Sequence, residues 1–283
     1  MQKIFLNIVL FFFLSITSAL EAEQAYCAKY EECREARWTD LKKTLFEDID
    51  LKSGEGIIEL STPKRAPDGA FVPISFKTHK LKNQDDFITK VHLVIDMNPS
   101  PYSGTFKFAT NIDQIELATR IRLDAYSKVR VIAETKKGDY FMAANFVMGS
   151  GGCSAPPLGD LDNMIATAGK MKIKVKKIEE KDGIAQAKIM ISHPQFNGLQ
   201  ANPVTTEMIP AYYIENFEVT YNDKVVMALE SDISISQDPT FRFNFPVDEG
   251  GDLKVTAKDT DGNVYSHFEK FVLQDNQLKI ASQ

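Results

Sequence analysis

Cysteine and histidine are scarce in this chain, and their spacing excludes the common metal-binding and catalytic motifs. The 283 residues contain three cysteines and four histidines. The histidines lie far apart, with no H-x-x-x-H or C-x-x-C pattern among them. The G-x-S-x-G sequence of serine hydrolases is also missing. We therefore expect no metal ion and no cofactor.

Clustered positive charge is missing too. The net charge is −6 and the isoelectric point is about 5.4, which argues against nucleic acid as a partner. The densest basic run, KMKIKVKK, extends from Lys170 to Lys177 and alternates lysines with Met171, Ile173 and Val175. This alternation predicts a half-buried strand with a solvated lysine face.

A long apolar run occurs only at the start of the chain. Residues 1–22 read MQKIFLNIVLFFFLSITSALEA, with one lysine before an apolar run over residues 4–16 and small residues after it. This order predicts a secretory signal peptide over residues 1–19, with cleavage after Ala19 or as late as Ala22. Because the run is short for a bilayer span and no second one follows, we expect an exported chain without a membrane segment after cleavage.

An odd number of cysteines leaves one thiol without a partner in the same chain. Cys27 and Cys33 lie in the helical-looking segment AYCAKYEECREARW. Six residues of continuous helix would separate their Cα atoms by about 9 Å, whereas a disulfide needs less than about 7 Å. A Cys27–Cys33 disulfide thus requires a break in the helix. We favour this disulfide for an exported protein, which leaves Cys153 free.

The spacing of apolar residues predicts one N-terminal helix followed by strands. Helical spacing continues as far as Ile49, and from Gly56 the period becomes two. The segment IELATRIRLDA, for example, places apolar residues on one face and Glu116, Arg120 and Arg122 on the other. Asn222–Asp223 and the sequence DTDGN (259–263) indicate hairpin turns. No helix separates successive strands, so we predict an all-β fold of antiparallel sandwiches.

Residues 147–160, VMGSGGCSAPPLGD, interrupt the strand pattern near mid-chain. Gly149, Gly151 and Gly152 surround Cys153, and two prolines follow. This composition predicts a flexible linker between two domains, with a short helix over residues 161–168. The linker supplies no cation, so we expect an exposed thiol with a pKa of about 8.5 rather than an activated nucleophile. Composition alone leaves open whether the cysteine is the purpose of the linker or incidental to it. In the latter case Cys153 would be buried under the linker or paired with Cys27 or Cys33.

Several strings in both halves resemble one family of sulfur-oxidation proteins. The strings VPI, NPSP, TRIRL and the closing GGC of the first half resemble SoxY. In the second half, ISHP, IPA and the pattern F-V-YN-K-V resemble SoxZ. Taken together, the chain is similar to a fused SoxYZ-like carrier of the kind associated with quinoprotein (PQQ) dehydrogenases.

The resemblance implies two immunoglobulin-like sandwiches, a SoxY-like domain over 23–153 and a SoxZ-like domain over 170–283, joined by a linker at 154–169. It implies a periplasmic carrier without catalytic turnover of its own. Cys153 would hold a thiosulfate-derived sulfur intermediate as a covalent adduct for partner sulfur-oxidation enzymes, and the neighbouring glycines would form a flexible arm.

Three departures from the family pattern bear on this expectation. One is the Cys27–Cys33 pair, which has no counterpart in the carrier pattern. The family's arm is typically a free C-terminal GGCGG, whereas here SAPP follows the cysteine and the chain continues. The signal lacks the twin arginine often seen on SoxY, which indicates Sec export.

One alternative to the carrier function is a non-catalytic binding or assembly module for a periplasmic quinoprotein alcohol dehydrogenase system, with Cys153 incidental. Another is a thiol-dependent enzyme, although the sequence supplies no base beside the thiol.

Overall fold

The computed structural model describes residues 27, 29–83, 85–108, 112, 114–178, 183–247, 249–274 and 277–281. The predicted signal peptide lies outside these residues. None of the helices described is both long enough and apolar enough to cross a membrane.

Strands dominate the described residues, as the period-two pattern predicts. The elements are α2 (Glu31–Phe46), β1 (Leu51–Ser53), β2 (Ile58–Ser61), β3 (Val72–Thr78), β4 (Ile88–Ile95), β5 (Tyr102–Phe108), β6 (Glu116–Ile121), β7 (Ser127–Thr135), β8 (Tyr140–Val147), α3 (Leu161–Ala166), β9 (Met171–Lys177), β10 (Ile184–Ile191), β11 (Ile214–Tyr221), β12 (Lys224–Ser231), β13 (Thr240–Pro246), β14 (Gly251–Asp259), β15 (Val264–Gln274) and β16 (Gln277–Ile280).

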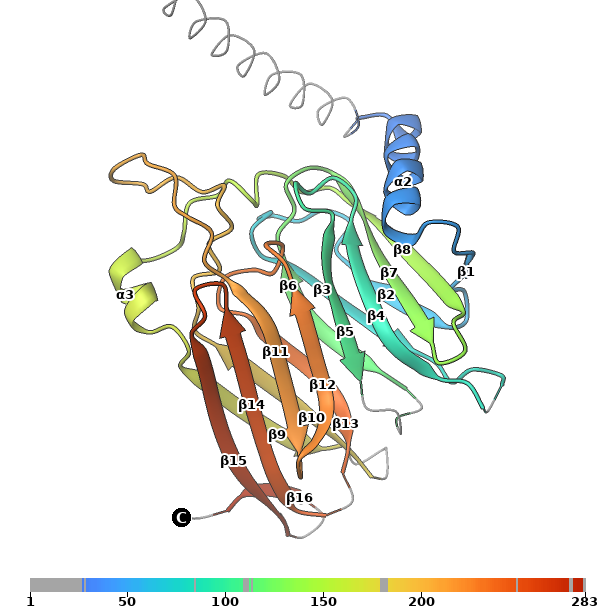
Figure 1. Cartoon of the computed structure of the whole chain (residues 1–283), viewed down its shortest axis with the longest axis vertical. Helices are drawn as coiled ribbons and strands as arrows, with labels where there is room; N and C mark the ends of the chain where they lie inside the picture. Colours follow the sequence, from blue (N-terminus) through green and yellow to red (C-terminus); the bar gives the residue numbers. More distant parts are fainter. Residues whose placement is uncertain are drawn as a thin grey trace, which may run out of the picture.

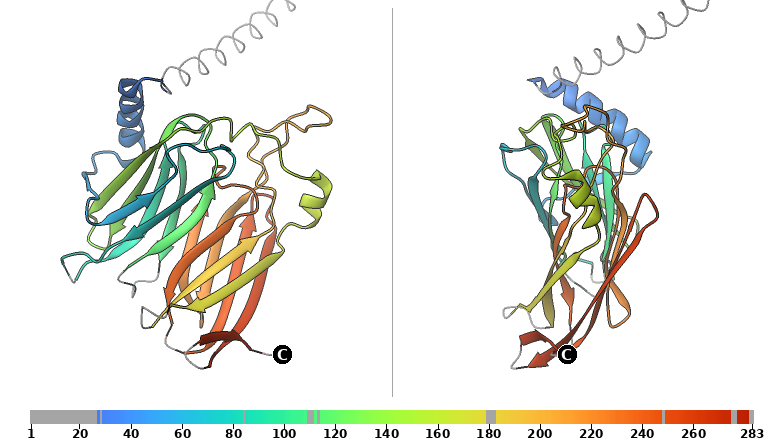
Figure 2. Two further views of the ribbon diagram at one scale, coloured as in Figure 1. Left: turned by 180° about the vertical axis from the view of Figure 1, so that it is seen from behind. Right: turned by 90° about the vertical axis from the view of Figure 1, so that its left-hand side faces the viewer.

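The strands form two open sheets that face each other, which confirms the predicted all-β fold with two sandwich domains (Figures 1 and 2). The larger sheet has the order β1-β8-β7-β4-β5-β12-β11-β14-β15-β16, and the smaller has the order β2-β3-β6-β13-β10-β9. Neighbouring strands are antiparallel except β1 and β8, which are parallel.

Both sheets continue from the first sandwich into the second. In the larger sheet β5 pairs with β12, with Phe106 opposite Leu229. In the smaller sheet β6 pairs with β13, with Leu117 opposite Phe243. All four of these side chains are buried at 2% exposure or less and belong to one apolar cluster that runs through both halves. The two sandwiches therefore share a continuous core.

Alternating burial explains why the sequence forms these strands. On β10, Ala185, Ala187, Ile189 and Ile191 are buried, while Lys188 between them is exposed. The Asn222–Asp223 hairpin is confirmed: the pair joins β11 to β12 with φ values of 48° and 61°.

The positive φ values of Asn222 and Asp223 are the ones that a two-residue type I′ turn requires. The turn predicted at 259–263 is also confirmed, because this segment connects β14 to β15. The short helix predicted over 161–168 is α3, which Asp160 caps by accepting a hydrogen bond from the Asn163 backbone at 2.8 Å.

Helix α2 covers the outer face of the larger sheet. Trp38 and Phe46 pack with Val94 of β4 and Ile132 of β7 in a small apolar cluster of their own. The guanidinium of Arg130 lies 3.8 Å from the centre of the Trp38 ring. This contact combines apolar burial with a cation–π interaction, so the helix is held on the first sandwich.

A break before α2 allows the disulfide between Cys27 and Cys33. Tyr30 is the N-cap residue and is extended, with φ −112° and ψ 128°, so the two cysteines do not share a continuous helix. Their Cα atoms are 4.8 Å apart and their sulfurs are bonded. The disulfide packs against Met97 and Ala125 at the end of the first sandwich.

Candidate functional site

Cys153 lies in the loop that joins β8 to α3. This Cys153 loop, residues 148–160, runs along the same end of the molecule as the long connection 192–213 between β10 and β11 (Figure 1). The expectation of an exposed thiol is wrong: Cys153 is free but 0% exposed. Long-range contacts, which its Gly- and Pro-rich composition does not reveal, hold the loop against the protein.

Backbone hydrogen bonds fix the loop on one side. The amide of Gly151 donates to the Asp124 carbonyl at 2.8 Å, and the amide of Gly152 donates to the Leu123 carbonyl at 2.8 Å. Both acceptors lie in the connection between β6 and β7. These bonds hold the residues before Cys153 against the connection between β6 and β7.

Two of the three glycines lie where the loop packs closely against the protein, and the third has a positive φ. A Cβ atom on Gly152 would lie 2.0 Å from the Gly69 carbonyl oxygen, a distance that no side chain tolerates. Gly151 has φ +72°, in the left-handed region that glycine adopts without strain. A Cβ on Gly149 would lie 3.0 Å from the Cβ of Ala66.

Side chains of the second sandwich hold the loop on the other side. Asn197 Nδ2 donates to the Cys153 carbonyl at 2.8 Å, and Gln200 Nε2 donates to the Ala155 carbonyl at 2.8 Å. Both amides come from the 192–213 connection. Sequence reasoning missed these residues, because a lone asparagine or glutamine in a loop carries no signal of its partner.

Burial also sets the electrostatics of the thiol. Desolvation raises the pKa of Cys153 to about 12, Asp124 adds to the rise and Arg122 opposes it. The expected pKa of about 8.5 is therefore wrong for this conformation. At neutral pH the buried sulfur is a neutral thiol, which is a poor nucleophile.

Arg122 is the positive charge that lowers the pKa of this thiol, against the effect of burial. The sequence pattern groups Arg122 with Glu116 and Arg120 on the polar face of a strand, but Arg122 is buried at 2% exposure. The alternation applies along β6, which ends at Ile121, and Arg122 lies one residue beyond it. Its Nη1 donates to the Gly152 carbonyl at 3.1 Å and its Nη2 to the Gln195 carbonyl at 3.2 Å.

A second buried polar group, His193, is connected to Arg122 through hydrogen bonds to the Gln195 backbone. The His193 Nδ1 atom accepts a hydrogen bond from the Gln195 backbone at 3.2 Å. Its ring lies 4.5 Å from that of Tyr212. Burial lowers the pKa of His193 to about 4 even though Asp259 opposes this, so the ring is neutral at pH 7. The histidine serves packing rather than acid–base chemistry.

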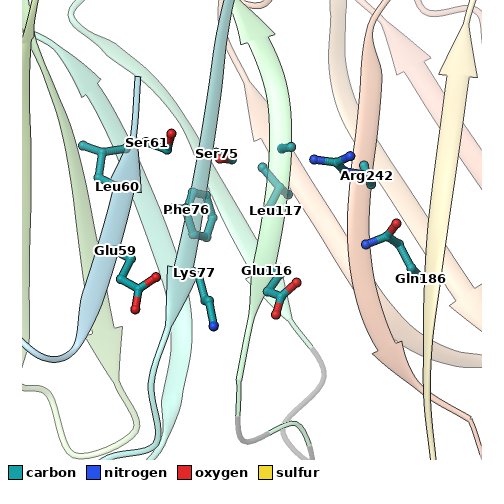
Figure 3. Close-up of a pocket in the computed structure, with 11 residues that line it drawn as sticks. Glu59, Leu60, Ser61, Ser75, Phe76, Lys77, Glu116, Leu117, Gln186 and Arg242 are labelled. Carbon is teal, nitrogen blue, oxygen red and sulfur yellow. The ribbon is translucent and has the colours of Figure 1, made fainter. Parts of the chain in front are cut away.

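A groove of about 480 Å³ lies elsewhere, on the smaller sheet (Figure 3). Its lining includes Glu59, Phe76, Lys77, Glu116 and Arg242, from strands of both sandwiches. Charges of both signs line it and no residue of the Cys153 loop contributes. Within the described part of the chain, no group of three or more His, Cys, Asp or Glu side chains is placed to hold a metal ion.

Comparisons with known proteins identify the two halves. Residues 42–153 match the family model of the sulfur oxidation protein SoxY, and residues 171–270 match that of the sulphur oxidation protein SoxZ. The two matches together cover about three quarters of the chain. No match was found among curated protein sequences.

Two solved structures have weaker similarity. The sulfur carrier protein SoxY from Chlorobium limicola f thiosulfatophilum is 19% identical with a TM-score of 0.34, over 46% of this chain and 97% of that one. A Bacteroides ovatus protein of a mixed-linkage glucan utilization locus, SGBP-B, is 13% identical with a TM-score of 0.19, over 82% of this chain and 67% of that one.

The SoxY match ends at Cys153, and the SoxZ match begins just after α3. We call residues 42–153 the SoxY part and residues 171–270 the SoxZ part. The chain belongs to the SoxYZ sulfur-oxidation proteins, with both parts fused in one polypeptide.

Proposed function

We propose that the protein is a sulfur carrier that holds a thiosulfate-derived intermediate covalently on Cys153. The observation that carries this proposal is the position of the thiol. Cys153 is the only free cysteine in the part of the chain that the structure describes, and it is the last residue of the SoxY match. It also lies where the SoxY and SoxZ parts meet, in hydrogen-bonding contact with the latter.

A carrier of this kind must open before it can react. The thiol is 0% exposed, so a partner enzyme reaches it only after the Cys153 loop leaves its position. Opening breaks the bonds that Asn197 and Gln200 make to the loop and returns the thiol to water, where its pKa falls toward about 8.5. Opening thus exposes and activates the thiol in one step.

The chemistry of loading then belongs to partners. Joining thiosulfate to the thiol forms an S–S bond and releases one proton and two electrons, which a partner oxidoreductase has to accept. Burial raises the pKa of Cys153, which supports a protein without turnover of its own. The partners we propose are periplasmic sulfur-oxidation enzymes or a quinoprotein dehydrogenase system, and the proposed location is the periplasm after Sec export.

Mass spectrometry of intact protein from its native host tests the proposal. We expect adducts on Cys153 that a thiol reductant removes, and none on a Cys153→Ser variant. Protein isolated during active sulfur oxidation with an unmodified Cys153 in every molecule would contradict a carrier role.

The burial of Cys153 favours one other candidate function. A non-catalytic binding or assembly module for a quinoprotein alcohol dehydrogenase system has no need of an accessible thiol, and Cys153 would then serve packing. The Cys153→Ser variant separates the two functions in the host. A carrier loses its contribution to sulfur oxidation, whereas an assembly module keeps its activity.

A further inference from the structure

Arg122 is a buried positive charge without an ion-pair partner among the described residues. Its side chain is 2% exposed, and its hydrogen bonds go to two neutral carbonyl oxygens, those of Gly152 and Gln195. The Nε atom is buried and has no hydrogen-bond partner at all. A guanidinium buried in this way is costly, because charged groups inside proteins are normally paired.

The carboxylate of Asp68 does not fill this role. It acts on Arg122 through its charge without an ion-pair contact, and its Oδ1 atom accepts a hydrogen bond from the Ala70 backbone at 2.7 Å. The closest link from the guanidinium leads instead to the Cys153 loop, through the Gly152 carbonyl at 3.1 Å. The unpaired charge therefore lies beside the residue that precedes Cys153, and it acts on the Cys153 thiol through its charge.

We propose that Arg122 binds the anionic end of the cargo on Cys153 while the loop is closed. This inference rests on the proposed carrier function and names the chemical class of cargo that the closed site selects, an adduct ending in a sulfonate or a similar oxyanion. The planar guanidinium offers several donors in a fixed fork, which suits oxyanions better than a neutral group. The anion would supply the negative charge that the unloaded site lacks.

The expected consequence is that the charge of the cargo controls loop opening. An anionic adduct returns to a site that holds a buried cation, so the closed state gains a charge-assisted interaction. A neutral adduct of similar position gains nothing from Arg122. The loaded protein should therefore stay closed longer when its cargo is a sulfonate.

Chemical loading produces both kinds of adduct without partner enzymes. The Cys153 thiolate attacks a central sulfur of tetrathionate, which breaks its central S–S bond, releases thiosulfate and leaves a Cys–Sγ–S–SO₃⁻ group. Methyl methanethiosulfonate reacts with the same thiolate to leave the neutral disulfide Cys–Sγ–S–CH₃ and release methanesulfinate. In each case one S–S bond breaks and one forms, and the thiol proton goes to the buffer.

Hydrogen exchange at the amides of Gly151 and Gly152 then reports opening, because both donate to carbonyls of the closed site. In the wild type we expect about tenfold slower exchange with the anionic adduct than with the neutral one, equivalent to about 1.4 kcal/mol. Arg122→Met should abolish this difference, and Arg122→Lys, which keeps the charge, should retain part of it. Arg242→Met is the control and should leave it unchanged, since Arg242 lines the groove on the smaller sheet, to which no residue of the Cys153 loop contributes.

Equal exchange with the two adducts in the wild type would overturn the inference, and this comparison does not depend on whether Arg122→Met folds. A difference that persists in a folded Arg122→Met variant would also overturn it. Failure of the carrier function itself looks different: no native adduct is found on Cys153, while chemically loaded protein still shows the charge-dependent exchange.

Discussion

The side chain of Asn197 donates a hydrogen bond of 2.8 Å to the backbone carbonyl of Cys153. The two residues come from different parts of the protein, because Asn197 belongs to the SoxZ part and Cys153 ends the SoxY part. Both residues are buried, so water does not compete for this bond. The SoxZ part thereby contributes to the burial of the cysteine of the SoxY part.

Removing this bond should make the thiol more reactive. We expect Asn197→Ala to raise the rate of Cys153 alkylation by iodoacetamide about fivefold, since a net hydrogen bond contributes about 1 kcal/mol to the closed state. Asn145→Ala is the matched control, because Asn145 donates at 2.8 Å to Leu60, outside the Cys153 loop. An alkylation rate that is the same in Asn197→Ala and the wild type would show that the bond does not hold the loop.

The glycines next to the cysteine should differ in their tolerance of side chains. Gly152→Ala places a Cβ atom 2.0 Å from the Gly69 oxygen, so the loop cannot close and Cys153 should react at nearly the rate of an exposed thiol. Gly151→Asn should behave like the wild type. No atom lies within 4 Å of its Cβ position, and asparagine tolerates φ +72°. Alkylation rates of both variants check this, and similar rates would indicate that the glycines provide only flexibility.

The buried thiol should make stability depend on pH above about pH 8.5. Burial, with Asp124 adding to it, raises the pKa of Cys153 to about 12, whereas the thiol of an unfolded chain has a pKa of about 8.5. The folded state therefore retains a proton that the unfolded state has lost. The stability from the neutral thiol is fully present below about pH 8.5 and is lost as pH rises toward 12.

Urea denaturation between about pH 9 and about pH 10.5 measures this loss. We expect the free energy of unfolding of the wild type to fall by about 1.4 kcal/mol per pH unit more than that of Cys153→Ala. Parallel pH curves for the two proteins would mean that the thiol is exposed in solution.

Loss of the Cys27–Cys33 disulfide should destabilise the end of the first sandwich. The disulfide closes a short loop, for which chain entropy predicts a contribution of about 2 kcal/mol. We expect the Cys27→Ser/Cys33→Ser double variant to lose about this much free energy of unfolding. Hydrogen exchange should also quicken near Ala125, against which the disulfide packs. Unchanged stability of the double variant, or two free thiols in the wild type, would contradict this.

The strands were predictable from the sequence because their signals are local. Alternating burial on β10 and the Asn222–Asp223 turn depend on residues that are neighbours in the chain. The break before α2 was predictable only as a condition for the disulfide, since Tyr30 carries no signal of its extended backbone. The pairing of β5 with β12 and of β6 with β13 joins residues more than a hundred positions apart, and no local pattern indicates it.

The environment of Cys153 was not predictable for the same reason. Glycine and proline indicate a loop, but whether a loop is free or docked depends on distant acceptors and donors such as Leu123 and Asn197. Arg122 shows a second limit. Strand periodicity places a residue on a face only while the strand lasts, and Arg122 lies just beyond the end of β6. The odd number of cysteines was enough to predict a free one, whereas the residues that contact Cys153 could be identified only from the folded structure.

Because both sheets run through the SoxY part and the SoxZ part, they affect how the protein responds to proteolysis and whether the two parts can be synthesised separately. A protease cut within residues 154–169 would leave a nicked particle still joined by the ladders between β5 and β12 and between β6 and β13. Either fragment synthesised alone would instead leave two strands without their partners, β5 and β6 in one fragment or β12 and β13 in the other, and would expose its half of the shared core. Unpaired strand edges and exposed apolar side chains promote aggregation. Fusion in one polypeptide therefore ensures that the SoxY part and the SoxZ part, whose sheets and core are shared, are made in equal amounts.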